Sequence, residues 1–198
     1  MAKIGLSNFK YAILSSDTAG TPVYSTAGKS PGKAISCSVD ISSNDAKLYA
    51  DDALAESDTS FQSGTVTIGI DEDDVQTMGD LLGHTVTTSG TSPNLTYTIT
   101  RKSSDTAPYV GLGRIVTKMV NGNYRYKVEF LYKVKFSEPK AENTTRGEST
   151  EFGTYELEGT VSTLSDGKWS VAQLFETKSA AQTYLDSLFP TAVVQDNN

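Results

Sequence analysis

The feature that most constrains this fold is a long alternation of apolar and mostly charged side chains over residues 124–136. Such a pattern predicts a β-strand with one face in a core. We expect that face to carry Tyr124, Tyr126, Val128, Phe130, Tyr132, Val134 and Phe136. At ~3.3 Å per residue the strand would span roughly 40 Å, which is long for a compact domain and indicates a large sheet or barrel.

Turn signals place this strand in a hairpin. Asn121-Gly122 separates it from the apolar run 115–120, and Asn-Gly is the strongest short hairpin signal because both residues tolerate positive φ. Asp166-Gly167 predicts a second hairpin, which would join strands over 155–164 and 168–172.

The remaining elements are also mostly strands. Short apolar or alternating runs predict strands over 9–14, 34–41 and 65–70. Helical spacing of apolar residues predicts helices over 71–82 and 177–188. Their expected N-caps are Asp71 and Thr177, and Gly83 and Pro190 lie just beyond their ends.

The fold class that follows is mainly β, of the sandwich or barrel type, with one or two short flanking α-helices. The 23 Ser and 25 Thr in 198 residues suit half-exposed strands better than helices. A chain of this length fits one domain, which we place at residues 1–190, followed by a frayed tail at 191–198.

Charge and hydropathy exclude several classes. A net charge of -7 is the wrong sign for a generic grip on nucleic acid or an anionic membrane. No apolar run approaches the ~18 residues of a membrane span, and the N-terminus lacks the pattern of a signal peptide. The lone Cys37 excludes an internal disulfide and indicates folding in a reducing cytoplasm.

The charges are also separated along the chain. Residues 40–80 hold eleven acidic side chains and one lysine, whereas residues 101–135 hold eight basic and two acidic side chains. Complementary patches of this kind favour head-to-tail self-association. Two solvated surfaces would have the same composition, so both interpretations stay open.

No motif predicts catalysis, a cofactor or a metal. The single histidine, His84, follows a predicted helix end, where a structural role is common, and Cys37 has no nearby base in the sequence. The run 71–74 suits helix capping better than metal binding. Gly111 and Gly113 do not form a dinucleotide-binding motif, and glycines within a strand mark a bulge or a close backbone approach.

Seven strings, read in order, resemble the major tail proteins (tail tube proteins) of long-tailed phages and prophages of Gram-positive bacteria. They are MAKIGLSNFKYA, KLYADDALAE, LLGHTV, APYVGLG, GNYRY, KFSEP and ELEGT. The resemblance rests on the order and spacing of all seven strings, and residues 177–198 have no counterpart in it.

The resemblance implies subunits that form hexameric rings, which stack into a tail tube for DNA delivery. Strands of neighbouring subunits would combine into one β-barrel around the lumen. The partners would be further copies of the chain, the tape measure protein, and the tail terminator and baseplate proteins, with DNA passing through without specific binding. The protein would be assembled in the host cytoplasm and located in the virion tail, without membrane, cofactor or enzymatic activity.

Two sets of residues are candidates within such a tube. We expect residues 47–58 to form an extended hairpin or loop that reaches a neighbouring subunit, since apolar residues there lie among acids. The predicted inter-subunit contacts are Leu48, Tyr49, Asp51, Asp52, Leu54, Lys127, Lys133 and Lys135. The predicted lumen-facing residues are Ser36, Ser38, Asp40, Thr65 and Thr67, because these alternating positions lack Lys and Arg.

Other functions remain open. A monomeric β-sandwich module for binding or surface display would have the same strands and polar surface. Single-stranded nucleic acid binding is disfavoured because the aromatic residues of 124–136 alternate with its basic residues rather than sharing their face. An enzyme is disfavoured because no nucleophile has an identifiable base.

Overall fold

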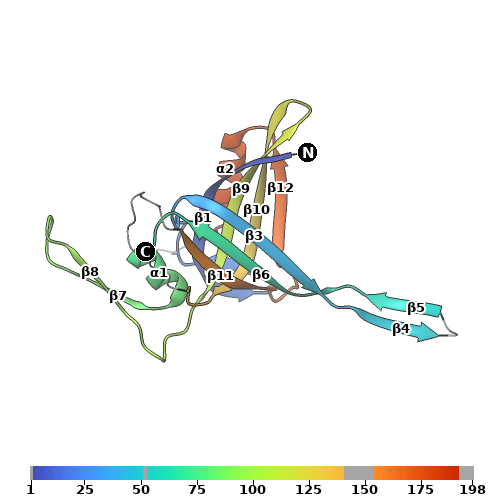
Figure 1. Ribbon diagram of the computed structural model, residues 1–198, viewed down its shortest axis with the longest axis horizontal. Coiled ribbons are helices and arrows are strands. Elements are labelled where there is room, and N and C mark those ends of the chain that lie inside the picture. Colours follow the sequence, from blue (N-terminus) through green and yellow to red (C-terminus); the bar gives the residue numbers. More distant parts are fainter. Residues whose placement is uncertain (1, 51–52, 141–153, 192–198) are drawn as a thin grey trace, which may run out of the picture.

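The computed structural model describes residues 2–50, 53–140 and 154–191. Within these ranges the chain is mainly β with two short helices, which confirms the predicted fold class (Figure 1). In chain order the elements are β1 (Ala2–Thr18), β2 (Thr21–Tyr24), β3 (Ala34–Ser43), β4 (Ala46–Ala50), β5 (Ala53–Asp58), β6 (Phe61–Ile70), α1 (Val75–Leu82), β7 (Thr85–Ser89), β8 (Thr96–Thr100), β9 (Tyr109–Val120), β10 (Asn123–Phe136), β11 (Tyr155–Ser162), β12 (Ser170–Phe175) and α2 (Lys178–Ser187).

Eight of these strands form one antiparallel sheet. Its order is β2-β1-β9-β10-β11-β6-β3, and β12 pairs with β10 beside this path. The sheet folds over itself, so that β1, β6, β9, β11 and the end of β10 enclose one apolar group with α1. This group, cluster 1, consists of Phe9, Tyr11, Val66, Ile68, Ile70, Met78, Leu81, Leu82, Val110, Leu112, Leu131, Val134, Phe136, Leu157 and Val161.

The hairpin predicted at Asn121-Gly122 is confirmed. Asn121 has φ of 49° and Gly122 has φ of 78°, the positive values that a tight two-residue turn requires. The turn joins β9 to β10 and places Val120 opposite Asn123. This register fixes which residues of the two strands face each other over most of their length.

No single face of β10 packs against one core along the whole strand. Its pairing with β9 shifts by one residue between Leu131 and Val134, a β-bulge that exchanges the two faces of the strand. Val128 and Phe130 therefore pack in a second cluster, whereas Val134 and Phe136 pack in cluster 1. The prediction of a single apolar face along this strand is wrong for this reason.

The second cluster lies beneath helix α2. Cluster 2 consists of Ala12, Tyr24, Ile115, Val128, Phe130, Ala181, Leu185 and Phe189. A Cβ atom at Gly113 would lie 2.4 Å from Leu185 Cδ1, and one at Gly111 would lie 2.6 Å from Tyr24 Cε1. Both glycines thus mark a close approach, as predicted, because any side chain there would displace the helix or the tyrosine.

The hairpin predicted at Asp166-Gly167 is wrong. Residues 163–169 do form a turn, in which Leu164 N–H donates to Lys168 C=O, but β11 and β12 do not pair with each other. Instead β11 pairs with β10 from Lys133 onward, and β12 pairs with β10 up to Leu131. The two strands lie end to end along one edge of β10, and the turn is an excursion between them opposite the bulge.

The helices begin close to their predicted positions. Thr177 caps α2 by accepting from Ala180 N–H, and Gly83 ends α1 with φ of 76°, both as predicted. Asp71 is not the cap of α1, because Asp74 accepts from Thr77 N–H at 2.9 Å and the helix starts after it. Asp71 instead accepts from the backbone N–H of Lys33 at 2.7 Å.

Two hairpins extend away from the folded sheet in different directions (Figure 1). One is formed by β4 and β5, which prolong the β3–β6 pair, so the described part of 47–58 is the extended hairpin that the sequence predicts. The other is formed by β7 and β8, which the sequence analysis did not identify. No helix in the described ranges is long and apolar enough to cross a membrane.

Candidate functional site

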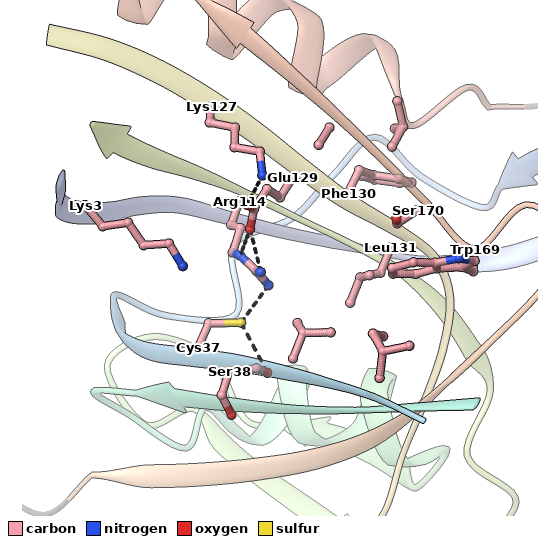
Figure 2. Close-up of a pocket in the computed structure, with 14 residues that line it drawn as sticks. Lys3, Cys37, Ser38, Arg114, Lys127, Glu129, Phe130, Leu131, Trp169 and Ser170 are labelled. Atoms are coloured by element: carbon pink, nitrogen blue, oxygen red, sulfur yellow. Dashed lines mark hydrogen bonds and ion pairs between the residues drawn. The ribbon is translucent and has the colours of Figure 1, made fainter. Parts of the chain in front are cut away.

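A cleft lies between β3 and the β9–β10 hairpin, on the side of the hairpin opposite α2. Its volume is about 510 Å³. Figure 2 shows that its wall combines a charged part on β1, β9 and β10 with an apolar part near Trp169. The residues that give it this character are Lys3, Cys37, Arg114, Lys127, Glu129, Leu131 and Trp169.

An ion cluster occupies the charged wall (Figure 2). Glu129 Oε2 accepts from Arg114 Nη2 at 2.6 Å, and Glu129 Oε1 accepts from Lys127 Nζ at 2.7 Å. Burial alone would raise the pKa of Glu129, but the hydrogen bonds and charges of Lys127 and Arg114 outweigh it and hold the pKa below its usual value. These side chains are mostly buried, so the cluster belongs to the framework of the cleft wall.

Cys37 joins β3 to this cluster. Arg114 Nη1 lies 2.7 Å from Cys37 Sγ. Burial raises the pKa of the Cys37 thiol, although the charge of Arg114 opposes the shift. A thiol in this protonated state is a poor nucleophile, so the contact indicates a packing role.

Three further basic residues continue the charged wall towards the β9–β10 turn. Lys118 of β9 lies directly opposite Lys3 of β1 on one side and Arg125 of β10 on the other. We call Lys3, Lys118 and Arg125 the basic row. Because Lys118 and Arg125 are each two residues from a cleft-lining position, Val116 and Lys127, the row lies on the same face as the cleft.

A second exposed surface covers the outside of β3, β6 and β11, and none of these strands contains Lys or Arg. Ser38, Thr67 and Glu158 lie side by side across the three strands, and Thr65 pairs with Asp40. We call this surface the outer polar face. It consists of Ser36, Ser38, Asp40, Thr65, Thr67, Glu156 and Glu158.

The five predicted lumen residues all belong to the outer polar face. Thr67 is half-buried and the other four are exposed, while their strand neighbours Val66 and Ile68 are buried in cluster 1. The predicted alternation of β3 and β6 is therefore present. Their position in a lumen stays a prediction.

The predicted contact residues do not form one surface. Lys127 lies on the cleft wall, whereas Lys133 and Lys135 follow the bulge and lie next to Ser162 and Thr160 of β11. Leu48 and Tyr49 lie in β4, and Leu54 lies in β5. The structure describes only the backbone of these three residues. Asp51 and Asp52 lie outside the described residues.

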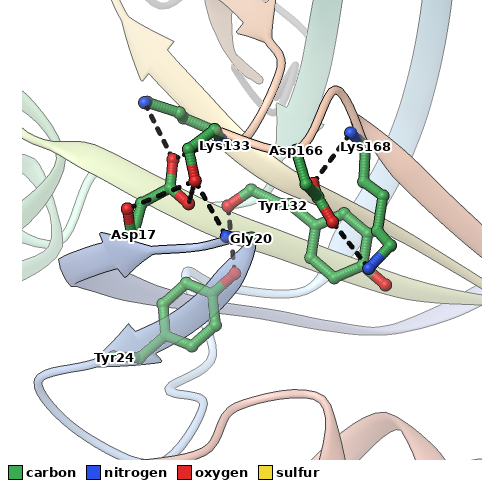
Figure 3. Close-up of polar contacts among 8 residues, drawn as sticks. Asp17, Gly20, Tyr24, Tyr132, Lys133, Asp166 and Lys168 are labelled. Carbon is green, nitrogen blue, oxygen red and sulfur yellow. Dashed lines mark hydrogen bonds and ion pairs between the residues drawn. The ribbon is translucent and has the colours of Figure 1, made fainter.

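Lys133 is partly engaged within its own subunit. Its Nζ lies 3.4 Å from Asp17 Oδ2, and the same carboxylate accepts from Ser165 N–H at 2.9 Å (Figure 3). Ser165 Oγ in turn accepts from Gly20 N–H at 2.8 Å. These bonds fasten the 163–169 excursion to the β1–β2 turn, so Asp17 competes with any partner for Lys133.

His84 lies between two carboxylates at the end of α1. Nδ1 is 2.8 Å from Asp105 Oδ2, and Nε2 contacts Glu138 Oε1. The hydrogen bond to Asp105 raises the pKa of His84 in spite of burial, and the same bond lowers the pKa of Asp105. Both ring nitrogens are thus occupied, which leaves neither free to act as a base for a Ser or Cys nucleophile.

Among the residues that the structure describes, no group of three or more His, Cys, Asp or Glu is placed to hold a metal ion. Two carboxylates of the 71–74 run have structural partners, since Asp74 caps α1 and Asp71 accepts from the backbone N–H of Lys33.

Sequence reasoning missed the basic row and the Arg114–Glu129 pair. A signal for both existed, because a two-residue turn at Asn121-Gly122 already places Lys118 opposite Arg125 and Arg114 opposite Glu129. Lys3 had no such signal, because it joins the row through pairing between distant segments of the chain.

No protein-family model matches the chain, and no curated protein matches it.

Proposed function

We propose that this chain is a structural subunit of a phage tail tube, whose copies assemble into hexameric rings stacked as a conduit for DNA. The observation that carries the proposal is that β3, at one side of the outer polar face, is an edge strand of the sheet. In the parts of the chain that the structure describes, β3 pairs only with β6. A strand of a second copy can pair with such an edge and extend the sheet, which closes the edge in a shared barrel.

The composition of the outer polar face suits the inside of a DNA conduit. Each fixed cation on the wall would add a phosphate contact whose release slows transit, and β3, β6 and β11 carry none. Asp40, Glu156 and Glu158 instead repel phosphate. In this proposal the same lumen encloses the tape measure protein before DNA passes, and tail terminator and baseplate proteins close the two ends of the tube.

Electron microscopy and light scattering of the purified, concentrated protein test the proposal. Rings or tubes with a central channel are the expected result. A protein that stays monomeric at its highest soluble concentration contradicts the proposal and favours a monomeric β-sandwich binding module. Such a module would use the cleft as its binding site.

The lumen assignment has a separate test. Replacing Ser38 and Asp40 together with Lys should leave tubes intact by microscopy but reduce genome delivery by particles built from the variant. A matched control places Lys at Thr87 and Ser89, which are exposed on the β7–β8 hairpin, and should deliver normally. If the first variant forms no tubes, Ser38 and Asp40 lie at a subunit contact and the lumen assignment fails.

A further inference from the structure

The basic row places like charges directly opposite one another across three strands. Lys118 faces Lys3 on β1 and Arg125 on β10. Cross-strand neighbours of like charge destabilise a sheet, so a row of three basic residues needs acidic partners to offset the repulsion. Arg125 has such a partner, because its Nη2 lies 2.8 Å from Glu176 Oε1.

Lys3 and Lys118 have no such compensation. Neither forms an ion pair with a described residue, and Lys3 is exposed. Glu129, the acidic residue that lines the cleft together with Lys3, already binds Arg114 and Lys127. The end of the β1–β9–β10 face therefore carries excess positive charge within the subunit.

The β4–β5 hairpin has the complementary charge. Residues 45–58, which we call the acidic arm, contain five acidic side chains and one lysine. Figure 1 shows the hairpin projecting away from the sheet, far from the N-terminal end of β1, where Lys3 of the basic row lies. An arm in this position cannot neutralise the row of its own subunit, but it is free to reach another.

We propose that the acidic arm of one copy docks on the basic row of a second copy. The inference rests on self-assembly as proposed above and names the surface that receives the arm. Because donor and acceptor surfaces are different, the contact is head-to-tail and can repeat from subunit to subunit. Charge complementarity fixes its register, and neutralisation of Lys3 and Lys118 removes the repulsion within the row.

The first test reverses two charges of the row. Lys3→Glu with Lys118→Glu should raise the concentration needed for assembly at low salt at least about tenfold, because the acidic arm then meets like charge. The control, Lys102→Glu with Lys168→Glu, makes the same change in net charge at exposed residues outside the row and should assemble like the wild type. Thermal melts of both variants verify that the subunits remain folded.

The second test is a charge exchange. Asp45→Lys, Glu56→Lys and Asp58→Lys together leave an arm with four lysines and two aspartates and should also block assembly, whereas a mixture of the row and arm variants should co-assemble. In that mixture each acidic arm finds a basic row and each basic arm finds an acidic row. A row variant that assembles at wild-type concentrations, or a mixture that does not assemble, overturns the docking inference. A wild-type protein that never assembles overturns the proposed function itself.

Discussion

One face of the β9–β10 hairpin is covered by α2, whereas the other lies open along the cleft. The covered face carries Gly113, Ile115, Val128 and Phe130, and the helix approaches so closely that a Cβ atom at Gly113 would meet Leu185. The open face carries charged residues: Arg114 and Lys127 pair with Glu129, whereas Lys118 forms no ion pair with a described residue. The same two strands thus complete a core with one face and line a charged cleft with the other.

The largest effect should come from the covered face. Leu185→Ala removes a fully buried side chain from cluster 2 and should reduce the free energy of unfolding by about 2–5 kcal/mol. Chemical denaturation measures the change. A loss below about 1 kcal/mol would mean that α2 is not required to complete the fold.

Gly113→Ala also tests how closely α2 packs on the covered face. Alone it should destabilise the protein by about 1–3 kcal/mol, because the new Cβ overlaps Leu185. In the Leu185→Ala background the closest of the overlaps is removed and only the 2.9 Å approach to Phe130 Cδ2 remains, so the double variant should be more stable than the sum of the two losses predicts. Gly5→Ala is the control, since its Cβ would meet Thr117 at an ordinary 3.8 Å. Additive losses in the double variant would show that the two sites are not in contact.

The open face should contribute less. Glu129→Gln leaves Arg114 and Lys127 without their common acceptor charge, and we expect a loss of about 1–3 kcal/mol, between the values for exposed and fully buried pairs. Glu158→Gln, on the outer polar face, makes the same chemical change at an exposed site and should alter stability by less than about 0.5 kcal/mol. Equal losses of stability at the two positions would contradict the distinction between the buried, paired charge of Glu129 and the exposed charge of Glu158.

The smallest effect concerns acid pH. The pKa of Glu129 is lower in the folded protein than its usual value of 4.5, so its stabilising contribution is complete above that value. The contribution is lost as pH falls through the folded-state pKa, because the folded protein takes up the proton less readily than the unfolded chain. Melting temperatures between pH 6 and pH 3 should therefore fall less steeply for Glu129→Gln than for the wild type. Parallel curves would contradict this linkage.

Local rules in the sequence predicted much of this fold. The Asn121-Gly122 turn, the cap at Thr177 and the stop at Gly83 each depend on the conformation of one or two residues. The alternation of β6 also separates its buried positions, Val66 and Ile68, from the exposed Thr65, although no residue of β3 is buried. These features were accessible because the physics that determines them acts over a few neighbouring residues.

The features that the sequence did not predict depend mostly on pairing between distant segments of the chain. The bulge after Leu131 exchanges the faces of β10 because β11 and β12 take over the same edge in succession, and no local pattern signals that exchange. The β7–β8 hairpin was missed because its strands are rich in Thr and expose most side chains, with only Val86 and Ile99 half-buried. The basic row needed the pairing of Lys3 with Lys118.

The end-to-end arrangement of β11 and β12 also bears on how the subunit opens. Residues 126–136 of β10 have β9 on one edge and either β12 or β11 on the other, so few of their backbone groups face solvent. Each of these amide hydrogens bonds to one neighbouring strand and exchanges with deuterated water when that ladder opens. Among the described strands β12 pairs only with β10, whereas β9 is held on its other edge by β1. The amides of β10 that bond to β9 should therefore exchange most slowly in the subunit, at a rate governed by global unfolding, while the β7–β8 hairpin exchanges through local opening.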